Sequence, residues 1–80
     1  MADRLDSMSI LVAAVDAGSL SAGARQLGLP LATVSRRIAD LEYSLGTQLM
    51  HRSARGVKLT DPGAAYVAAC RRILEEVSEA

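Results

Sequence analysis

The chain has 80 residues, half of them hydrophobic, which suits one small domain with a compact core of limited size. Its formal net charge is zero, yet residues 21–60 carry six basic and two acidic side chains, a surplus of +4. No apolar run is long enough for a membrane span, the first residues do not form a signal peptide, and a single cysteine excludes an internal disulfide. The composition favours a cytoplasmic protein whose basic middle can attract phosphate, and it excludes a membrane protein.

The first predicted helix covers about residues 4–17. Its apolar residues recur at steps of three and four, as on one face of a helix: Leu5, Met8, Val12 and Val15. Asp3 is the candidate N-cap, and Gly18 supplies the stop. We interpret this helix as core scaffold.

Two helical patterns then meet at a tight break over residues 28–30, and together they cover about residues 21–44. Ser21 is placed to cap the short first helix, and Gly23 within it indicates that another helix approaches closely. The second helix has an apolar face formed by Leu31, Val34, Ile38, Leu41 and Leu45. A short helix, a turn containing Gly, and a helix with one apolar and one basic face are typical of a helix-turn-helix.

The second helix of such a motif lies in the major groove of DNA, and its first turns meet the base edges. Pro30 suits its first turn, and four residues in the first two turns are candidates for base contacts: Ala32, Thr33, Ser35 and Arg36. The alternative for Arg36 and Arg37 is an ordinary solvated surface, with Asp40 and Glu42 close enough to pair with them.

Residues 51–60 read as a small two-stranded hairpin with a basic tip. Apolar residues alternate at Val57 and Leu59, and basic residues flank a turn that contains glycine: Arg52, Arg55 and Lys58. A hairpin after a helix-turn-helix is the wing of a winged helix, and basic side chains at its tip can reach the adjacent minor groove.

The last predicted helix occupies residues 61–80, with Thr60 or Asp61 as its cap and Pro62 at its first position. Four residues recur with heptad-like spacing: Tyr66, Cys70, Ile73 and Val77. They form either a dimer seam or a face that folds back on the domain's own core. The helix has no stop signal, so we expect the chain to be a fragment of a longer protein.

The order and spacing of these motifs resemble the N-terminal DNA-binding domain of LysR-type transcriptional regulators over nearly the whole chain. The matching stretches are AGSLS at 17–21, ARQLG at 24–28, VSRRI at 34–38, residues 41–42, residues 45–46, Leu49, Arg52, RGVKLT at 55–60 and Gly63.

The resemblance implies a mainly α fold: a winged helix-turn-helix of three helices plus a small β-hairpin wing over residues 4–60, followed by a linker helix that starts at residues 61–80. Pairing of linker helices implies a homodimer or higher homo-oligomer on a pseudo-palindromic operator of double-stranded DNA. A C-terminal effector domain, absent from this chain, implies a small-molecule co-inducer.

The resemblance also assigns roles to individual residues. In the major groove it places Leu31, Ala32, Thr33, Ser35 and Arg36. It places Arg55 in the minor groove, and it makes Arg37, Arg52 and Lys58 phosphate contacts. The sequence departs from the family where Pro30, Leu31 and Ala32 remove polar groups from the reading end, where Met50 replaces the usual Phe, and where His51 replaces a common acid.

Enzymatic activity has little support and is not expected, because no acid pair, nucleophile triad or phosphate loop stands out in the sequence. His51 and Cys70 have no partners at ligand spacing, so neither a metal nor a cofactor is expected. Two other interpretations stay open: a winged-helix regulator of another family, and a helical module that binds an acidic protein partner.

Overall fold

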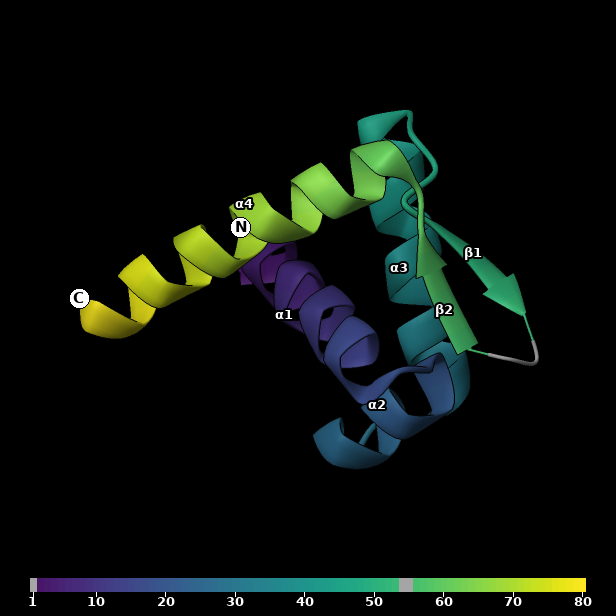
Figure 1. Cartoon of the computed structure of the whole chain (residues 1–80). Coiled ribbons are helices and arrows are strands. Elements are labelled where there is room, and N and C mark those ends of the chain that lie inside the picture. Colours follow the sequence, from purple (N-terminus) through teal and green to yellow (C-terminus); the bar gives the residue numbers. More distant parts are fainter. Residues whose placement is uncertain (1, 54–55) are drawn as a thin grey trace.

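A computed structural model of the chain describes residues 2–53 and 56–80, and these residues contain four helices and one antiparallel two-stranded sheet (Figure 1). The elements follow one another as α1 (Ala2–Ala17), α2 (Leu20–Leu27), α3 (Leu31–Leu45), β1 (Met50–Ser53), β2 (Gly56–Leu59) and α4 (Asp61–Glu79). The predicted fold class is confirmed, since the described residues form three helices and a β-hairpin wing followed by a further helix.

The cap of α2 is Ser19, and the prediction of Ser21 was wrong. Ser19 has an extended backbone (φ −161°, ψ 160°), and its side-chain oxygen accepts a hydrogen bond of 3.0 Å from the Ala22 N–H. A capping residue must be extended while the residues after it are helical. The turn at Gly18, with φ +90°, returns the chain to an extended conformation at Ser19, so Ser21 already lies inside the helix.

Two other helix starts also differ from the predictions. Helix α1 begins at Ala2, so Asp3 lies inside the helix and is not its N-cap. Pro30 is the N-cap of α3 (φ −61°, ψ 143°) and not a residue of its first turn. Because proline has no polar side chain, α3 starts without a side-chain capping bond.

The core lies where α1, α3, α4 and the start of the wing meet. These elements supply the largest fully buried side chains: Leu11, Val34, Ile38, Leu49, Met50 and Cys70. Met50, where the family usually has Phe, is a core residue at the start of β1. Gly23 lets α2 approach α1 closely, because a Cβ there would lie 2.7 Å from the Ala14 Cα, and the predicted close approach is confirmed.

The wing is the hairpin of β1 and β2, in which residues 50–53 pair with residues 59–56 in antiparallel register. It is fixed to the helices by a backbone hydrogen bond of 3.2 Å from the Val57 N–H to the Gly18 carbonyl. The second strand of the wing is therefore tied to the turn between α1 and α2.

Helix α4 begins after Thr60, one of the two predicted caps, whose side-chain oxygen accepts a hydrogen bond of 2.9 Å from the Gly63 N–H. Its first half packs on the core through the buried residues Val67 and Cys70. Its last turn runs away from the other helices (Figure 1), and residues 75–79 are exposed.

An exposed ion pair joins α4 to the end of α1. The Arg71 guanidinium donates hydrogen bonds of 2.6 and 3.1 Å to the two oxygens of the Asp16 carboxylate. These bonds lower the pKa of the Asp16 carboxyl below its ordinary value of 3.8. A lowered folded-state pKa stabilises the fold above pH 3.8, and this contribution is lost as the pH falls through the folded-state value.

We expect Asp16→Asn to lower the Tm slightly at pH 7, because an exposed ion pair contributes little. The difference from wild type should be smaller at about pH 3, below the ordinary pKa of 3.8, because part of the contribution of the lowered pKa is lost there. Circular dichroism melts at the two pH values measure this, with Glu75→Gln as a control that removes an exposed carboxylate of α4 outside the pair. A Tm difference of undiminished size in acid would contradict the electrostatic account.

Within the described residues, no single helix is long and apolar enough to span a membrane. Arg4–Ala17 and Leu20–Leu27 together pass on length and composition, but the two helices are bent by 119°. Five apolar residues of this pair lie in the core: Met8, Ile10, Leu11, Ala14 and Ala24.

Candidate nucleic-acid interface

Helix α3 has two distinct faces. Val34, Ile38 and Leu41 are buried against the core. On the other side, Leu31, Ala32 and Arg36 are exposed, and Thr33 and Ser35 are half-buried. All five residues predicted for the major groove therefore have side chains at least partly on the surface. The exposed start of α3 also carries the positive end of the helix dipole, which favours an anion.

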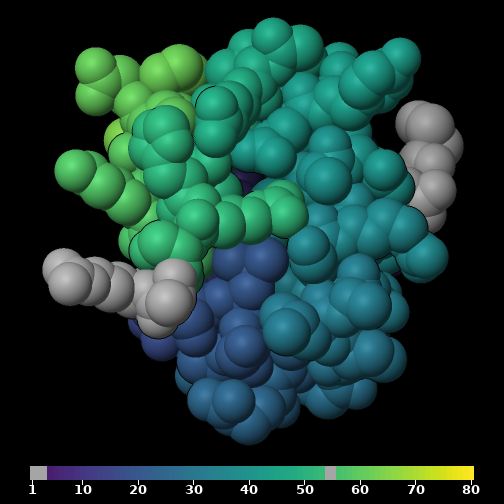
Figure 2. Space-filling model, turned by 90° about the vertical axis from the view of Figure 1, so that its right-hand side faces the viewer, coloured from purple at the N-terminus to yellow at the C-terminus, as the bar shows by residue number. Residues whose placement is uncertain are grey.

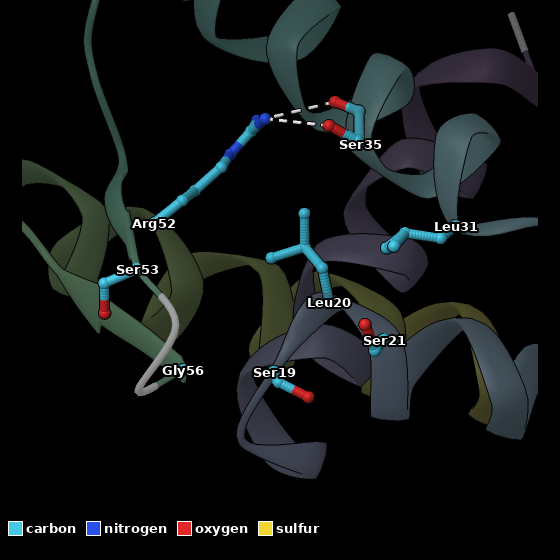
Figure 3. Close-up of a pocket in the computed structure, with 8 residues that line it drawn as sticks. All are labelled: Ser19, Leu20, Ser21, Leu31, Ser35, Arg52, Ser53 and Gly56. Atoms are coloured by element: carbon cyan, nitrogen blue, oxygen red, sulfur yellow. Dashed lines mark hydrogen bonds between the residues drawn. The ribbon is translucent and has the colours of Figure 1, made fainter.

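A groove of about 500 Å³ separates this part of α3 from the wing. Figure 2 shows the face on which it opens, with the wing beside α3 and α2 below them. Figure 3 shows side chains from three elements around the groove. Its lining residues are Ser19, Leu20, Ser21, Leu31, Ser35, Arg52, Ser53 and Gly56. Helix α3 and the first strand of the wing thus border one concave surface.

Arg52 reaches across this groove from β1 to α3. Its guanidinium donates hydrogen bonds of 2.9 Å to the Ser35 Oγ and 3.4 Å to the Ser35 carbonyl. It also lies 3.6 Å from the Glu42 Oε1. The alternative interpretation paired Glu42 with an arginine of its own helix, whereas its described ion pair is with Arg52 of the wing.

Sequence reasoning missed the contacts that Glu42 makes with the start of the wing. Its Oε2 accepts hydrogen bonds from the N–H groups of Leu49 (2.8 Å) and Met50 (3.3 Å), at the start of the wing. Its position one turn before the end of α3 was the available signal, because a carboxylate there can meet the N–H groups of the returning chain. That signal is weak without knowing the path of residues 46–49.

Arg37 lies between α3 and α1. Its Nε and one terminal nitrogen donate hydrogen bonds of 3.3 and 3.1 Å to the Oγ of the buried Ser7. The guanidinium is therefore engaged within the fold, and the phosphate contact predicted for Arg37 stays a prediction.

The structure describes two of the three basic residues predicted for the wing. Lys58 is exposed on β2, opposite the exposed His51 of β1. Arg55, predicted for the minor groove, lies outside the described residues. The structure therefore places Arg52 and Lys58 on the wing and leaves the role of Arg55 as a prediction.

The four residues predicted as a dimer seam do not share one environment. Cys70 is fully buried (0% exposed) in the domain's own core, where desolvation raises the pKa of its thiol, and it has no surface to offer a partner. Its inclusion in the seam is corrected: at this position the helix folds back on the core. Tyr66 is half-buried beside a shallow apolar groove, and Ile73 and Val77 are 43% and 51% exposed.

Known proteins resemble this chain in sequence and in fold. The sequence model described as bacterial regulatory helix-turn-helix protein, lysR family, matches residues 5–64. An HTH-type transcriptional regulator of Xanthomonas campestris is 45% identical over 80 residues, covering 100% of this chain and 23% of the relative. The HTH-type transcriptional activator AaeR of Escherichia coli is 39% identical over 77 residues, covering 96% and 25%. The chain thus spans about a quarter of the length of these curated relatives.

Solved structures show the same fold. The crystal structure of the CbnR DBD–DNA complex has a TM-score of 0.90 and 33% identity, covering 94% of this chain and 86% of that one. The BenM DBD in complex with benA site 1 DNA has a TM-score of 0.89 and 32% identity, covering 94% and 87%. In both cases the similarity extends over nearly all of the domain that was crystallised with DNA.

Proposed function

Because this chain belongs to the LysR family of bacterial regulatory helix-turn-helix proteins, we propose that it is the part of a transcriptional regulator that binds double-stranded DNA by sequence. One observation carries the proposal. Helix α3 buries one face in the core and exposes the other beside the wing, across a concave surface. A helix exposed in this way fits the major groove, and a neighbouring wing reaches the adjacent groove.

Each group on this surface has a proposed role. Leu31, Ala32, Thr33, Ser35 and Arg36 face the bases, with Arg36 the strongest candidate because arginine can donate two hydrogen bonds to guanine. Arg37 and Lys58 contact phosphates, and Arg55 enters the minor groove. The apolar Leu31 and Ala32 shift part of the recognition to contacts with thymine methyl groups. We assign the domain no catalytic step and no cofactor. We propose that the protein lies in the bacterial cytoplasm, because its proposed partner is DNA.

We propose that the whole regulator binds a pseudo-palindromic site as a homodimer or higher homo-oligomer. The exposed residues Ile73 and Val77 on the outer half of α4, together with Tyr66, are the proposed seam, since an exposed apolar stripe on a helix favours a partner. A separate C-terminal domain of the longer regulator would bind the small-molecule co-inducer.

The test is fluorescence anisotropy of this domain with labelled duplex from the region upstream of its own gene, compared with a scrambled duplex, over a series of salt concentrations. Tighter binding to the upstream duplex, with a linear loss of log affinity in log salt, supports the proposal. Absence of salt-sensitive binding to either duplex would overturn it in favour of a protein partner.

In this assay Arg36→Ala is expected to weaken binding to the upstream duplex by about 1–3 kcal/mol, because it removes a proposed bidentate base contact. Binding to the scrambled duplex should change much less. Arg72→Ala is the matched control, since it removes the same charge from an exposed position on α4. Equal losses for the two variants would remove Arg36 from the base-reading set.

A further inference from the structure

We propose that Arg52 is a positioning residue: held by Glu42, it fixes the wing to α3 and orients the Ser35 hydroxyl toward DNA. The resemblance to the family implied a phosphate contact for Arg52, whereas the structure engages its guanidinium with Ser35 and Glu42. The inference rests on the proposed DNA-binding function and gives one basic residue a different part in it.

The network begins with Glu42, which uses both carboxylate oxygens. Oε2 accepts hydrogen bonds from the N–H groups of Leu49 and Met50, and these bonds fix where the wing leaves the core. Oε1 faces the Arg52 guanidinium at 3.6 Å. The Glu42 side chain is only 18% exposed, and such partial burial weakens the competition of water and salt with the pair.

Arg52 extends this network to the surface that would read DNA. The planar guanidinium presents its N–H groups in a fixed fork. One terminal nitrogen donates to the Ser35 Oγ at 2.9 Å, and the other donates to the Ser35 carbonyl at 3.4 Å (Figure 3). The second nitrogen also lies 3.6 Å from the Glu42 Oε1. Lysine keeps the charge, but its single nitrogen cannot occupy the positions of both terminal nitrogens of Arg52.

The bond to Ser35 has a consequence for base recognition. Because the Ser35 Oγ accepts a hydrogen bond from Arg52, its own proton has to point away from the guanidinium. Ser35 lies among the residues proposed to face the major groove, so its hydroxyl is presented as a donor. In the major groove, a donor can form a hydrogen bond with the acceptor atoms O6 and N7 of guanine, N7 of adenine or O4 of thymine. Arg52 thereby contributes to specificity without touching a base.

A phosphate contact and a positioning role predict opposite results. If Arg52 only neutralised a phosphate, Arg52→Lys would bind like wild type, and Glu42→Gln would bind both duplexes more tightly because a negative charge is removed. If Arg52 positions the wing and Ser35, both substitutions weaken binding to the upstream duplex. Glu42→Gln is a sharp probe, because the glutamine oxygen can still accept from Leu49 and Met50 while its amide no longer attracts Arg52.

The experiment measures the affinities of wild type, Arg52→Lys and Glu42→Gln for the upstream and scrambled duplexes over a salt series. We expect the ratio of the two affinities to fall about tenfold in each variant, the size of a lost charge-assisted hydrogen bond. The salt slope of Arg52→Lys should stay unchanged. Glu75→Gln on α4 is the control for loss of a carboxylate and should leave the ratio unchanged.

Hydrogen exchange supplies a readout without DNA. The Val57 amide, bonded to the Gly18 carbonyl, should exchange faster in Arg52→Lys and Glu42→Gln, because the wing has lost its tie to α3. An unchanged affinity ratio with unchanged Val57 exchange overturns the inference while leaving the proposed function intact. Failure of wild type to bind either duplex overturns the proposed function, and the exchange rates then decide separately whether Glu42 and Arg52 hold the wing.

Discussion

Replacing Gly63 with alanine is expected to lower the free energy of unfolding by about 3 kcal/mol, at the upper end of the usual cost of overpacking. Gly63 is buried in the first turn of α4, and an added Cβ would overlap the Leu49 carbonyl oxygen. That carbonyl cannot easily move, because it accepts the Thr60 N–H at 3.0 Å. The greater helix propensity of alanine, about 1 kcal/mol, offsets only part of this cost.

Urea denaturation followed by circular dichroism measures this loss. Gly46→Ala is the matched control: Gly46 has φ +65°, but no atom lies within 4 Å of a Cβ added there. The free energy of unfolding of Gly46→Ala should therefore fall by about 1 kcal/mol, from backbone strain alone. Equal losses in the two variants would show that the contact between Gly63 and Leu49 does not limit the packing of α4.

Replacing Ile38 with alanine is expected to lower the free energy of unfolding by about 2–5 kcal/mol, the usual range for truncating a fully buried aliphatic side chain. Ile38 is 0% exposed and lies at the middle of the buried face of α3. DNA affinity should fall with it, because part of the protein would be unfolded or would hold α3 loosely.

The informative comparison is with Arg36→Ala on the opposite face of the same helix. Chemical denaturation should find Arg36→Ala close to wild type, since surface substitutions usually change stability by less than about 0.5 kcal/mol. Duplex binding should be weakened in both variants. If Ile38→Ala unfolds like wild type, or if Arg36→Ala is strongly destabilised, the division of α3 into a packing face and a reading face is wrong.

The sequence allowed the positions of the helices to be predicted well, because apolar residues at steps of three and four favour a helix. The buried side of α1 was predicted less well, since Leu11 and Ala14 are fully buried while Leu5 is exposed. The exact starts of the helices were less predictable. Ser19 and Ser21 are chemically the same, and the choice between them depends on where the chain becomes extended after Gly18. Propensity alone does not contain that information, since it follows from how α2 packs on α1.

Contacts between distant segments were harder to predict. Glu42 and Arg52 were both noticed as charged residues, but their pairing depends on the return of the chain through the core at Leu49 and Met50. The heptad-like spacing on α4 likewise predicted only part of what that helix contacts. It identified an apolar stripe but not what covers it, and the structure turns Cys70 inward while Val77 stays exposed.

The bond between the Val57 N–H and the Gly18 carbonyl ties the wing to the helix-turn-helix. Under the proposed function this tie restrains the separation between the two contact regions, so a duplex adapts its groove width and curvature to that separation. Sequences differ in the free energy that such deformation costs, since A-tracts are stiff and pyrimidine–purine steps kink easily. Under the proposed function, base pairs lying between α3 and the wing are expected to be selected by their flexibility, without a side chain that touches them.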